Sequence, residues 1–228
     1  GAGNIAIGYS SMKVHTTGHS NIAIGYEAMD DTDAGSTSSD SDHNIAIGSN
    51  SMSGTWTNLS SEWNVAIGSN TMDANMAGAD HNVALGYEAL KGFTTGYSNI
   101  AIGKAAGDAM TTAYQSVIIG TDAGSNITTG NANVIIGNDA GSAHDDSSFN
   151  TIIGYRANSN GTSGAGDNNT IVGAQAGGQQ ATMTGGNNVL MGAGVLQYAT
   201  STSGNTSIGC ESGKQLVTGD YNIFMGYS

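Results

Sequence analysis

Proline is absent from this chain of 228 residues, and cysteine occurs once, at Cys210. Without proline, and without a glycine at every third residue, the 36 glycines cannot form a collagen-like triple helix. A single cysteine excludes an internal disulfide framework and a metal site built from cysteines, and a lone cysteine of this kind is expected to be buried. Packing and hydrogen bonds must therefore hold the chain together.

Basic residues are almost as scarce. Lysine and arginine number five against 18 acidic residues, which gives a formal net charge of −13. Phosphate recognition needs clustered Lys and Arg side chains, so we expect no nucleic-acid partner. The same scarcity excludes a basic helix on a membrane surface. No apolar run approaches the ~20 residues that span a bilayer, and no signal peptide is visible, so we expect no membrane insertion.

The sequence does contain one pattern, repeated along its whole length. Residues 4–9 read NIAIGY, and residues 21–26 read NIAIGY again. The glycine of this motif, which we call the turn glycine, recurs most often every 17 residues. Longer spacings contain insertions, including residues 30–43 and 53–63. Other positions are numbered from the turn glycine, which occurs at Gly8, Gly25, Gly48, Gly68, Gly86, Gly103, Gly120, Gly137, Gly154, Gly173, Gly192, Gly209 and Gly226.

Each copy predicts one coil of a β-solenoid. An asparagine at position −4 is followed by mostly β-branched residues and then by the turn glycine, which predicts a short strand. Seventeen residues cannot hold a helix and a strand with their turns, but they fit two short strands and two turns. We therefore expect residues 1–228 to form a single all-β solenoid domain (β-roll or β-helix) of about 13 coils, a segment of a longer fibre.

The asparagine column suggests a structural ladder. Identical amides stacked at ~4.8 Å can hydrogen-bond from one coil to the next. Only Ser116 interrupts the column. We assign this structural role to Asn4, Asn21, Asn44, Asn64, Asn82, Asn99, Asn133, Asn150, Asn169, Asn188, Asn205 and Asn222.

Both faces of the predicted strands are apolar. Positions −3 and −1 point to one side, which we assign to the solenoid core, and position −2 points to the other. Position −2 is alanine in the first six copies and mostly a larger apolar residue later. Because one thin solenoid has a single interior, identical chains should cover the second face. We expect a parallel homotrimer with subunit contacts through Ile118, Ile135, Ile152, Ile171, Leu190 and Phe224.

Position +4 changes in step with position −2. It is methionine or leucine in most copies where position −2 is alanine, and mostly glycine where position −2 is isoleucine. This exchange of volume predicts that the two side chains share one space. The copies around Gly103, Gly192 and Gly209 do not follow the exchange.

The acidic residues are spread along the repeat instead of converging on a pocket. We therefore expect no enzyme, and we assign no catalytic or metal-binding residue. The longest insertion contains Asp30, Asp31, Asp33, Asp40 and Asp42, which could together hold Ca²⁺. Their spacing does not match an EF-hand loop, and a solvated loop is the simpler interpretation. We expect no cofactor, with Ca²⁺ as the alternative.

Aromatic residues indicate a candidate recognition site. Trp56 and Trp63 both lie in the insertion at residues 53–63, and position −5 of three successive copies holds His43, Trp63 and His81. These rings should stack as an exposed column, and aromatic faces bind sugar rings or partner proteins. We take His43, Trp56, Trp63 and His81 as the candidate site. Alternatively, the rings seal a coil edge or a subunit contact.

The repeats also resemble a known family. The segments NIAIGYSSM, HNVALGYEAL and SNIAIGKAAG, with TTGxxN lead-ins at Thr16, Thr94 and Thr128, resemble the NxAIGxxA repeats of bacteriophage tail-fibre shafts. They are also similar to the YadA-like heads of trimeric autotransporter adhesins, whose repeat is shorter. The resemblance implies a homotrimeric attachment fibre, extracellular or on a virion surface. From the residues of this chain, we take the loops between Asp30 and Glu62 as the candidate surface for contact with a cell-surface receptor or glycan. A self-assembling extracellular filament of end-to-end subunits is the alternative.

Overall fold

The computed structural model describes residues 1–15, 17–32, 41–56, 59–142, 146–159, 166–178 and 183–227. These residues form an all-β parallel solenoid of about twelve turns with a repeat of about 17 residues, which confirms the predicted fold class. Within the described ranges, each repeat contains one three-residue strand instead of the two strands expected. Turns and bends make up most of the remainder of each repeat.

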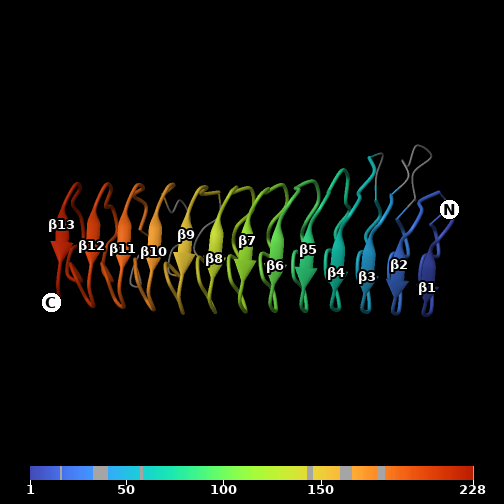
Figure 1. Cartoon of the computed structure of the whole chain (residues 1–228), viewed down its shortest axis with the longest axis horizontal. Helices are drawn as coiled ribbons and strands as arrows, with labels where there is room; N and C mark the ends of the chain where they lie inside the picture. Colours follow the sequence, from blue (N-terminus) through green and yellow to red (C-terminus); the bar gives the residue numbers. More distant parts are fainter. Residues whose placement is uncertain are drawn as a thin grey trace. The chain divides into compact units, whose positions relative to one another are not determined.

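The N-terminal unit, residues 1–114, carries six strands side by side (Figure 1). Neighbouring strands pair in parallel and in register, so that Ala6 lies opposite Ala23 and Ala23 opposite Ala46. The same register continues through the sixth strand. The strands are β1 (Ile5–Ile7), β2 (Ile22–Ile24), β3 (Ile45–Ile47), β4 (Val65–Ile67), β5 (Val83–Leu85) and β6 (Ile100–Ile102).

The C-terminal unit, residues 115–228, carries seven strands with the same parallel, in-register pairing. The position −2 residues again lie opposite one another, as in the pair Ile135 and Ile152. The strands are β7 (Val117–Ile119), β8 (Val134–Ile136), β9 (Thr151–Ile153), β10 (Thr170–Val172), β11 (Val189–Met191), β12 (Thr206–Ile208) and β13 (Ile223–Met225).

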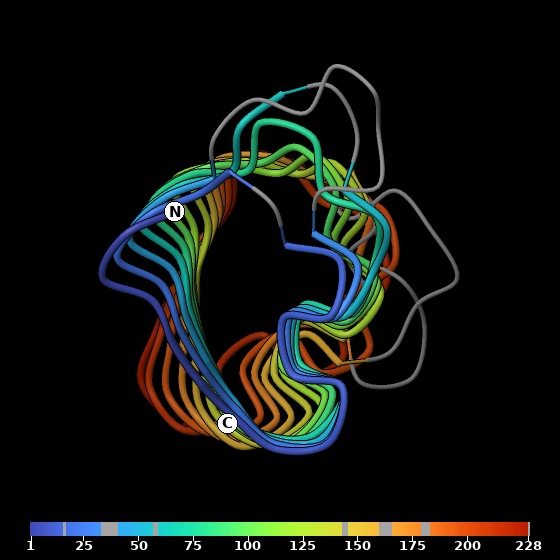
Figure 2. The same ribbon diagram turned by 90° about the vertical axis from the view of Figure 1, so that its right-hand side faces the viewer.

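Backbone hydrogen bonds join each turn to its neighbours. The amide of Ile22 donates to the carbonyl of Asn44 at 2.8 Å, and the amide of Gly25 donates to the carbonyl of Ile7 at 2.8 Å. Seen along the stack in Figure 2, the turns of the N-terminal unit follow one common outline. The sequence repeats because each turn must offer the same hydrogen-bonding outline to the next.

The turn glycine is required by the distance between neighbouring turns. All thirteen have φ between 121° and 146°, a region that side chains other than glycine rarely adopt. A Cβ on Gly120 would also lie 2.4 Å from the carbonyl oxygen of Gly137 in the adjacent turn. Backbone therefore occupies the space that any side chain would need.

The middle residue of each strand, at position −2, faces the interior. Ala23, Ala84 and Ile135 are completely buried, whereas their neighbours at positions −3 and −1 lie at the surface. The expected assignment of the two faces is therefore wrong. The predicted subunit contacts Ile118, Ile135, Ile152, Ile171 and Leu190 are at most 1% exposed within one chain. The turns are tight, so one inward side chain per strand, together with position +4, fills the interior.

Positions −2 and +4 share one space, as the volume exchange predicted. A Cβ on Gly141 would lie 2.9 Å from Cδ1 of Ile135, and Met29, Met52 and Met72 are buried at the same position where position −2 is alanine. Position +7 explains two of the copies that did not fit. In the Gly103 copy, Met110 Sδ would lie 2.6 Å from a Cβ on Gly107, so Met110 fills the gap.

The Gly192 copy shows the opposite case. Leu190 and Leu196 are both large and buried, and position +7 is the small residue Ala199. In these copies, positions −2, +4 and +7 therefore exchange volume at nearly constant packing, which is the pattern that close-packed cores tolerate.

Because positions −2 and +4 exchange volume, a substitution at one position should restore stability lost through a substitution at the other. Ile135→Ala should cost about 2–4 kcal/mol of unfolding free energy because it opens a cavity. Gly141→Met should cost about 1–3 kcal/mol because its side chain collides with Ile135. The double variant should recover at least about 2 kcal/mol of the summed loss, because it recreates the alanine–methionine pair of the N-terminal unit. Urea unfolding followed by circular dichroism measures the cycle, and simple additivity would contradict the shared space.

Candidate functional site

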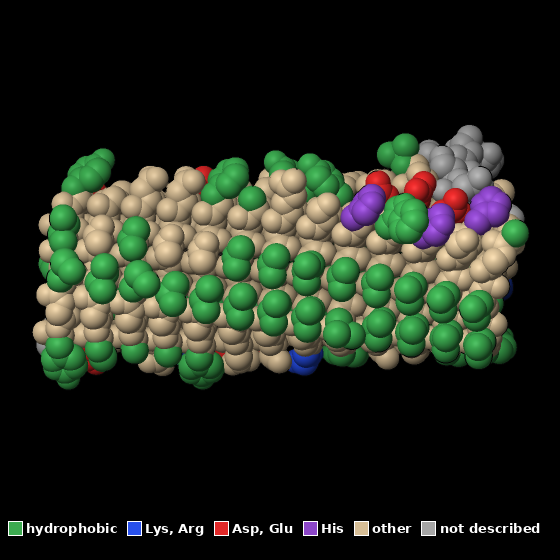
Figure 3. Space-filling model, viewed as in Figure 1, with side chains coloured by type: hydrophobic (Ala, Val, Ile, Leu, Met, Phe, Trp, Pro, Cys, Tyr) green, Lys and Arg blue, Asp and Glu red, His purple; other side chains and the backbone are tan. Residues whose placement is uncertain are grey.

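Three aromatic side chains stack on successive turns of the N-terminal unit. His43, Trp63 and His81 each precede a buried asparagine and have left-handed backbone, with φ of 58° to 60°. The ring centroids of His43 and Trp63 are 3.9 Å apart with planes 2° apart. Those of Trp63 and His81 are 6.4 Å apart at 15°. These three residues are called the aromatic column, and Figure 3 shows the region as histidine side chains around a hydrophobic one.

Stacking decides which part of each ring a ligand can reach. Trp63 is 50% exposed, yet its faces are turned toward His43 and His81, so its edge meets solvent. The outer faces of the two histidines point toward turns where the equivalent residues are Ser20 and Ser98, both exposed. A ligand would therefore meet a ridge of ring edges, with ring faces at its two ends. The stacking of the three rings is as predicted, but it covers the tryptophan faces that would otherwise bind a sugar ring or a partner.

Carboxylates lie directly beside the aromatic column. Asp42, Glu62 and Asp80 each precede one of its rings in sequence. Asp42 Oδ1 accepts a hydrogen bond from the His19 amide at 2.5 Å and lies 3.4 Å from His19 Nδ1. Asp80 Oδ1 accepts from the Glu62 amide at 2.8 Å. Sequence reasoning missed this arrangement, although the acid–aromatic pair in three successive copies was a readable signal.

Trp56 does not belong to the exposed site. It is 2% exposed, and its amide donates to the carbonyl of Asp31 at 3.2 Å. Trp56 stands eight residues after its turn glycine, and Met76 occupies the equivalent position of the next turn, also buried. The assignment of Trp56 to a recognition surface is therefore wrong, because the insertion folds this ring into the core.

The asparagine side chains form hydrogen-bonded ladders. Asn64 Oδ1 accepts from both the amide and the side-chain Nδ2 of Asn82 at 3.0 Å, and Asn82 Oδ1 accepts from the same two groups of Asn99 at 3.0 Å. In the C-terminal unit, Ser116 Oγ accepts from the Asn133 amide at 3.1 Å in place of an asparagine oxygen. The members between the first and last are at most 1% exposed, so this column is structural framework.

Two acidic residues of the insertion, Asp31 and Asp42, accept hydrogen bonds from neighbouring turns. Asp33 and Asp40 lie outside the described residues. Asp31 accepts a hydrogen bond from the Thr55 hydroxyl, and Asp42 accepts from the His19 amide. Burial, followed by the charges of Glu27 and Asp31, raises the pKa of Asp30 above its ordinary value. Over the described ranges, no three His, Cys, Asp or Glu side chains lie close enough to hold a metal ion.

The described part of the chain also contains no helix that is both long and apolar enough to cross a bilayer.

Cys210 is exposed, contrary to the expectation of a buried thiol. It stands directly after a turn glycine, the position where Tyr9, Tyr26 and Tyr87 also project into solvent. Its location thus follows from the repeat, since position +1 lies on the outside of the turn.

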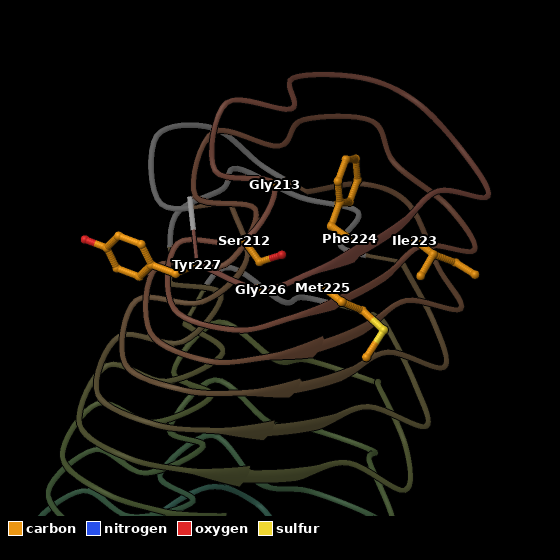
Figure 4. A pocket seen from close by; sticks show the side chains of 7 residues that line it. All are labelled: Ser212, Gly213, Ile223, Phe224, Met225, Gly226 and Tyr227. Carbon is orange, nitrogen blue, oxygen red and sulfur yellow. The ribbon is translucent and has the colours of Figure 1, made fainter.

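A cavity of about 340 Å³ lies beside β13. Ser212, Gly213 and residues 223–227 line it (Figure 4). In Figure 4 Phe224 points to one side of the strand, and Ile223 and Met225 point to the other. Phe224 thus shares the inward orientation of the other position −2 residues, which corrects its assignment as a subunit contact.

No protein-family model matches this chain, and neither a curated protein nor a solved structure matches it.

Proposed function

We propose that the chain is a shaft segment of an attachment fibre, of the phage tail-fibre or surface-adhesin type, displayed outside a cell or on a virion. The observation that supports this role is the uniform stacking of parallel turns, each joined to the next by backbone hydrogen bonds and the asparagine ladder. Within each unit, such a stack resists bending because every turn is hydrogen-bonded to its neighbours.

The aromatic column is the contact that we propose for attachment. It combines exposed ring edges, two imidazole faces and the flanking carboxylates Asp42, Glu62 and Asp80. Sugar hydroxyls donate hydrogen bonds to carboxylates, and sugar C–H groups pack against aromatic rings. A cell-surface glycan, free or on a receptor, is therefore the ligand class that this chemistry favours.

A single exposed ring tests the proposal. Trp63→Ala should weaken binding to intact bacterial cells and to an immobilised glycan panel at least tenfold, a loss of about 1.4 kcal/mol. Phe149→Ala is the matched control, because Phe149 is exposed at the same position of the repeat in the C-terminal unit and lacks a stacked column in the described structure. The control should bind as the unmodified chain does.

Far-UV circular dichroism of both variants shows whether the fold is kept. Folded Trp63→Ala protein that binds as well as the unmodified chain would remove the aromatic column from the attachment role.

A further inference from the structure

A second pair of stacked rings follows the carboxylates that lie beside the aromatic column. Tyr97 forms an isolated parallel bridge with Asp80, so it continues the row of Asp42, Glu62 and Asp80 by one turn. Tyr97 is 44% exposed. Its ring stacks on the ring of Tyr114 in the following turn, with centroids 5.1 Å apart and planes 5° apart. The row therefore changes from acidic side chains to aromatic rings within the N-terminal unit.

This row is called the acid–aromatic strip, and it consists of Asp42, Glu62, Asp80, Tyr97 and Tyr114. Backbone hydrogen bonds keep it in register with the aromatic column. The amide of Trp63 donates to the carbonyl of Asp42 at 3.1 Å, and the amide of His81 donates to the carbonyl of Glu62 at 3.0 Å. With turns ~4.8 Å apart, the strip extends over about 19 Å. It can therefore contact a ligand along a length instead of at one point.

No basic residue in the surrounding sequence balances the carboxylates of the strip. Between Lys13 and Lys91 the chain contains no lysine or arginine, whereas ten of its 18 acidic residues lie there. Figure 3 shows acidic side chains beside the histidine side chains on this face. Like charges on neighbouring turns repel one another, and a surface of one sign attracts ligands of the opposite sign. The strip therefore favours a ligand with positive groups and disfavours an acidic one.

The spacing of the carboxylates indicates how the positive groups are arranged. In the described part of the chain, no three acidic, histidine or cysteine side chains converge on one point that would hold a metal ion. Asp80 Oδ1 accepts from the Glu62 amide, whereas Asp80 Oδ2 and the carboxylate of Glu62 accept no hydrogen bond from the described residues. These acceptors lie on successive turns, so a matching ligand carries its positive groups one after another along a chain.

We propose that a linear glycan with free amino groups binds along the acid–aromatic strip. This inference rests on the attachment role proposed above and specifies the kind of glycan. The ammonium groups donate charge-assisted hydrogen bonds to the carboxylates, which are roughly twice as strong as neutral ones. The sugar rings pack against the aromatic column and, further along the chain, against Tyr97 and Tyr114.

Calorimetric titration with glucosamine oligomers at neutral pH and low salt tests this inference. The hexamer should bind the unmodified chain at least about tenfold more tightly than the dimer, because only the hexamer reaches from the carboxylates to the tyrosine pair. The fully N-acetylated hexamer has the same sugar backbone without the positive charges. It should bind at least about tenfold more weakly than the glucosamine hexamer, and added salt should reduce this difference.

Two variants separate the roles of charge and rings. Glu62→Gln combined with Asp80→Asn removes two charges and keeps a side-chain oxygen at both positions. The preference for the glucosamine hexamer over its acetylated form should fall at least about fivefold, with the affinity for the acetylated hexamer unchanged. Tyr97→Ala should weaken the binding of both hexamers by a similar factor and leave the dimer unaffected.

Asp167→Asn is the matched control. Asp167 occupies the same position of the repeat in the C-terminal unit, and its Oδ1 accepts from the Ser148 amide at 2.8 Å, as Asp80 Oδ1 does from Glu62. The residue after Asp167 is Asn168 instead of an aromatic residue. This variant should keep the affinities of the unmodified chain, and far-UV circular dichroism shows whether each variant is folded.

Three results would overturn the inference. One is an acetylated hexamer that binds as tightly as the glucosamine hexamer, and another is an unchanged preference in the folded Glu62→Gln, Asp80→Asn variant. The third is polylysine that binds as tightly as the glucosamine hexamer, since charge alone would then suffice. In each case a loss of glycan and cell binding in Trp63→Ala would still support the attachment role. If the unmodified chain bound no cell and no glycan, both proposals would be wrong.

Discussion

Gly120→Ala is expected to cost at least about 4 kcal/mol of unfolding free energy, or to prevent folding altogether. Two costs combine. Alanine at φ 138° carries backbone strain of about 1–3 kcal/mol. Its Cβ would also sit 2.4 Å from the carbonyl oxygen and 2.6 Å from the carbonyl carbon of Gly137, so two stacked backbones would have to separate. Urea unfolding of the purified variant measures the loss.

Gly194→Ala is the control that separates these two costs. Gly194 also has positive φ, at 63°, but an added Cβ would meet only Glu211 Cγ at 3.6 Å, an ordinary contact. Equivalent positions of other turns hold Asn50 and Glu88 with similar backbone. This variant should lose about 1 kcal/mol. If the two glycine variants were equally stable, contact between turns would not be the reason for glycine at position 120.

Asn82→Ala is expected to lower the unfolding free energy by about 3 kcal/mol. The loss is large because the substitution interrupts the asparagine ladder at a fully buried residue. Asn82 Oδ1 accepts from the Asn99 amide and from Asn99 Nδ2, and Asn82 Nδ2 donates to Asn64 Oδ1 and to the carbonyl of Gly96. Removing the side chain takes the acceptor Oδ1 away from the buried Asn99 amide. Losing the partner of one buried polar group costs about 1–3 kcal/mol. The small cavity adds to this cost.

Two further variants make the ladder prediction specific. Asn82→Ser should recover part of the loss, because Ser116 already accepts an amide in this way. Asn222→Ala should cost less than about 1 kcal/mol, since Asn222 is only half-buried at the last position of the column. Hydrogen exchange at the Asn99 amide should accelerate in Asn82→Ala and much less in Asn82→Ser. Equal exchange in all variants would show that the ladder is not stabilising.

Much of the fold was predictable because turns that stack on one another must have nearly the same sequence. A turn that hydrogen-bonds to its neighbours must repeat their backbone, so the asparagine, the turn glycine and the three-residue strand recur at a fixed period. The exchange between positions −2 and +4 was also visible, since two side chains that fill one space must vary together. Local repetition therefore identified the solenoid, the ladder and the aromatic column.

Only the tertiary structure decided which face of the strand is inside. Alternation separates positions −3 and −1 from position −2, but it does not say which set is enclosed when both are apolar. The tight turn admits one inward side chain per strand, so Ala84 and Ile135 are buried and Leu85 and Ile100 face outward. The same applies to the tryptophans, because chain closure around the interior buries Trp56 and leaves the edge of Trp63 exposed. Sequence determined the period and the columns, and the curvature of the turn determined the direction in which each column points.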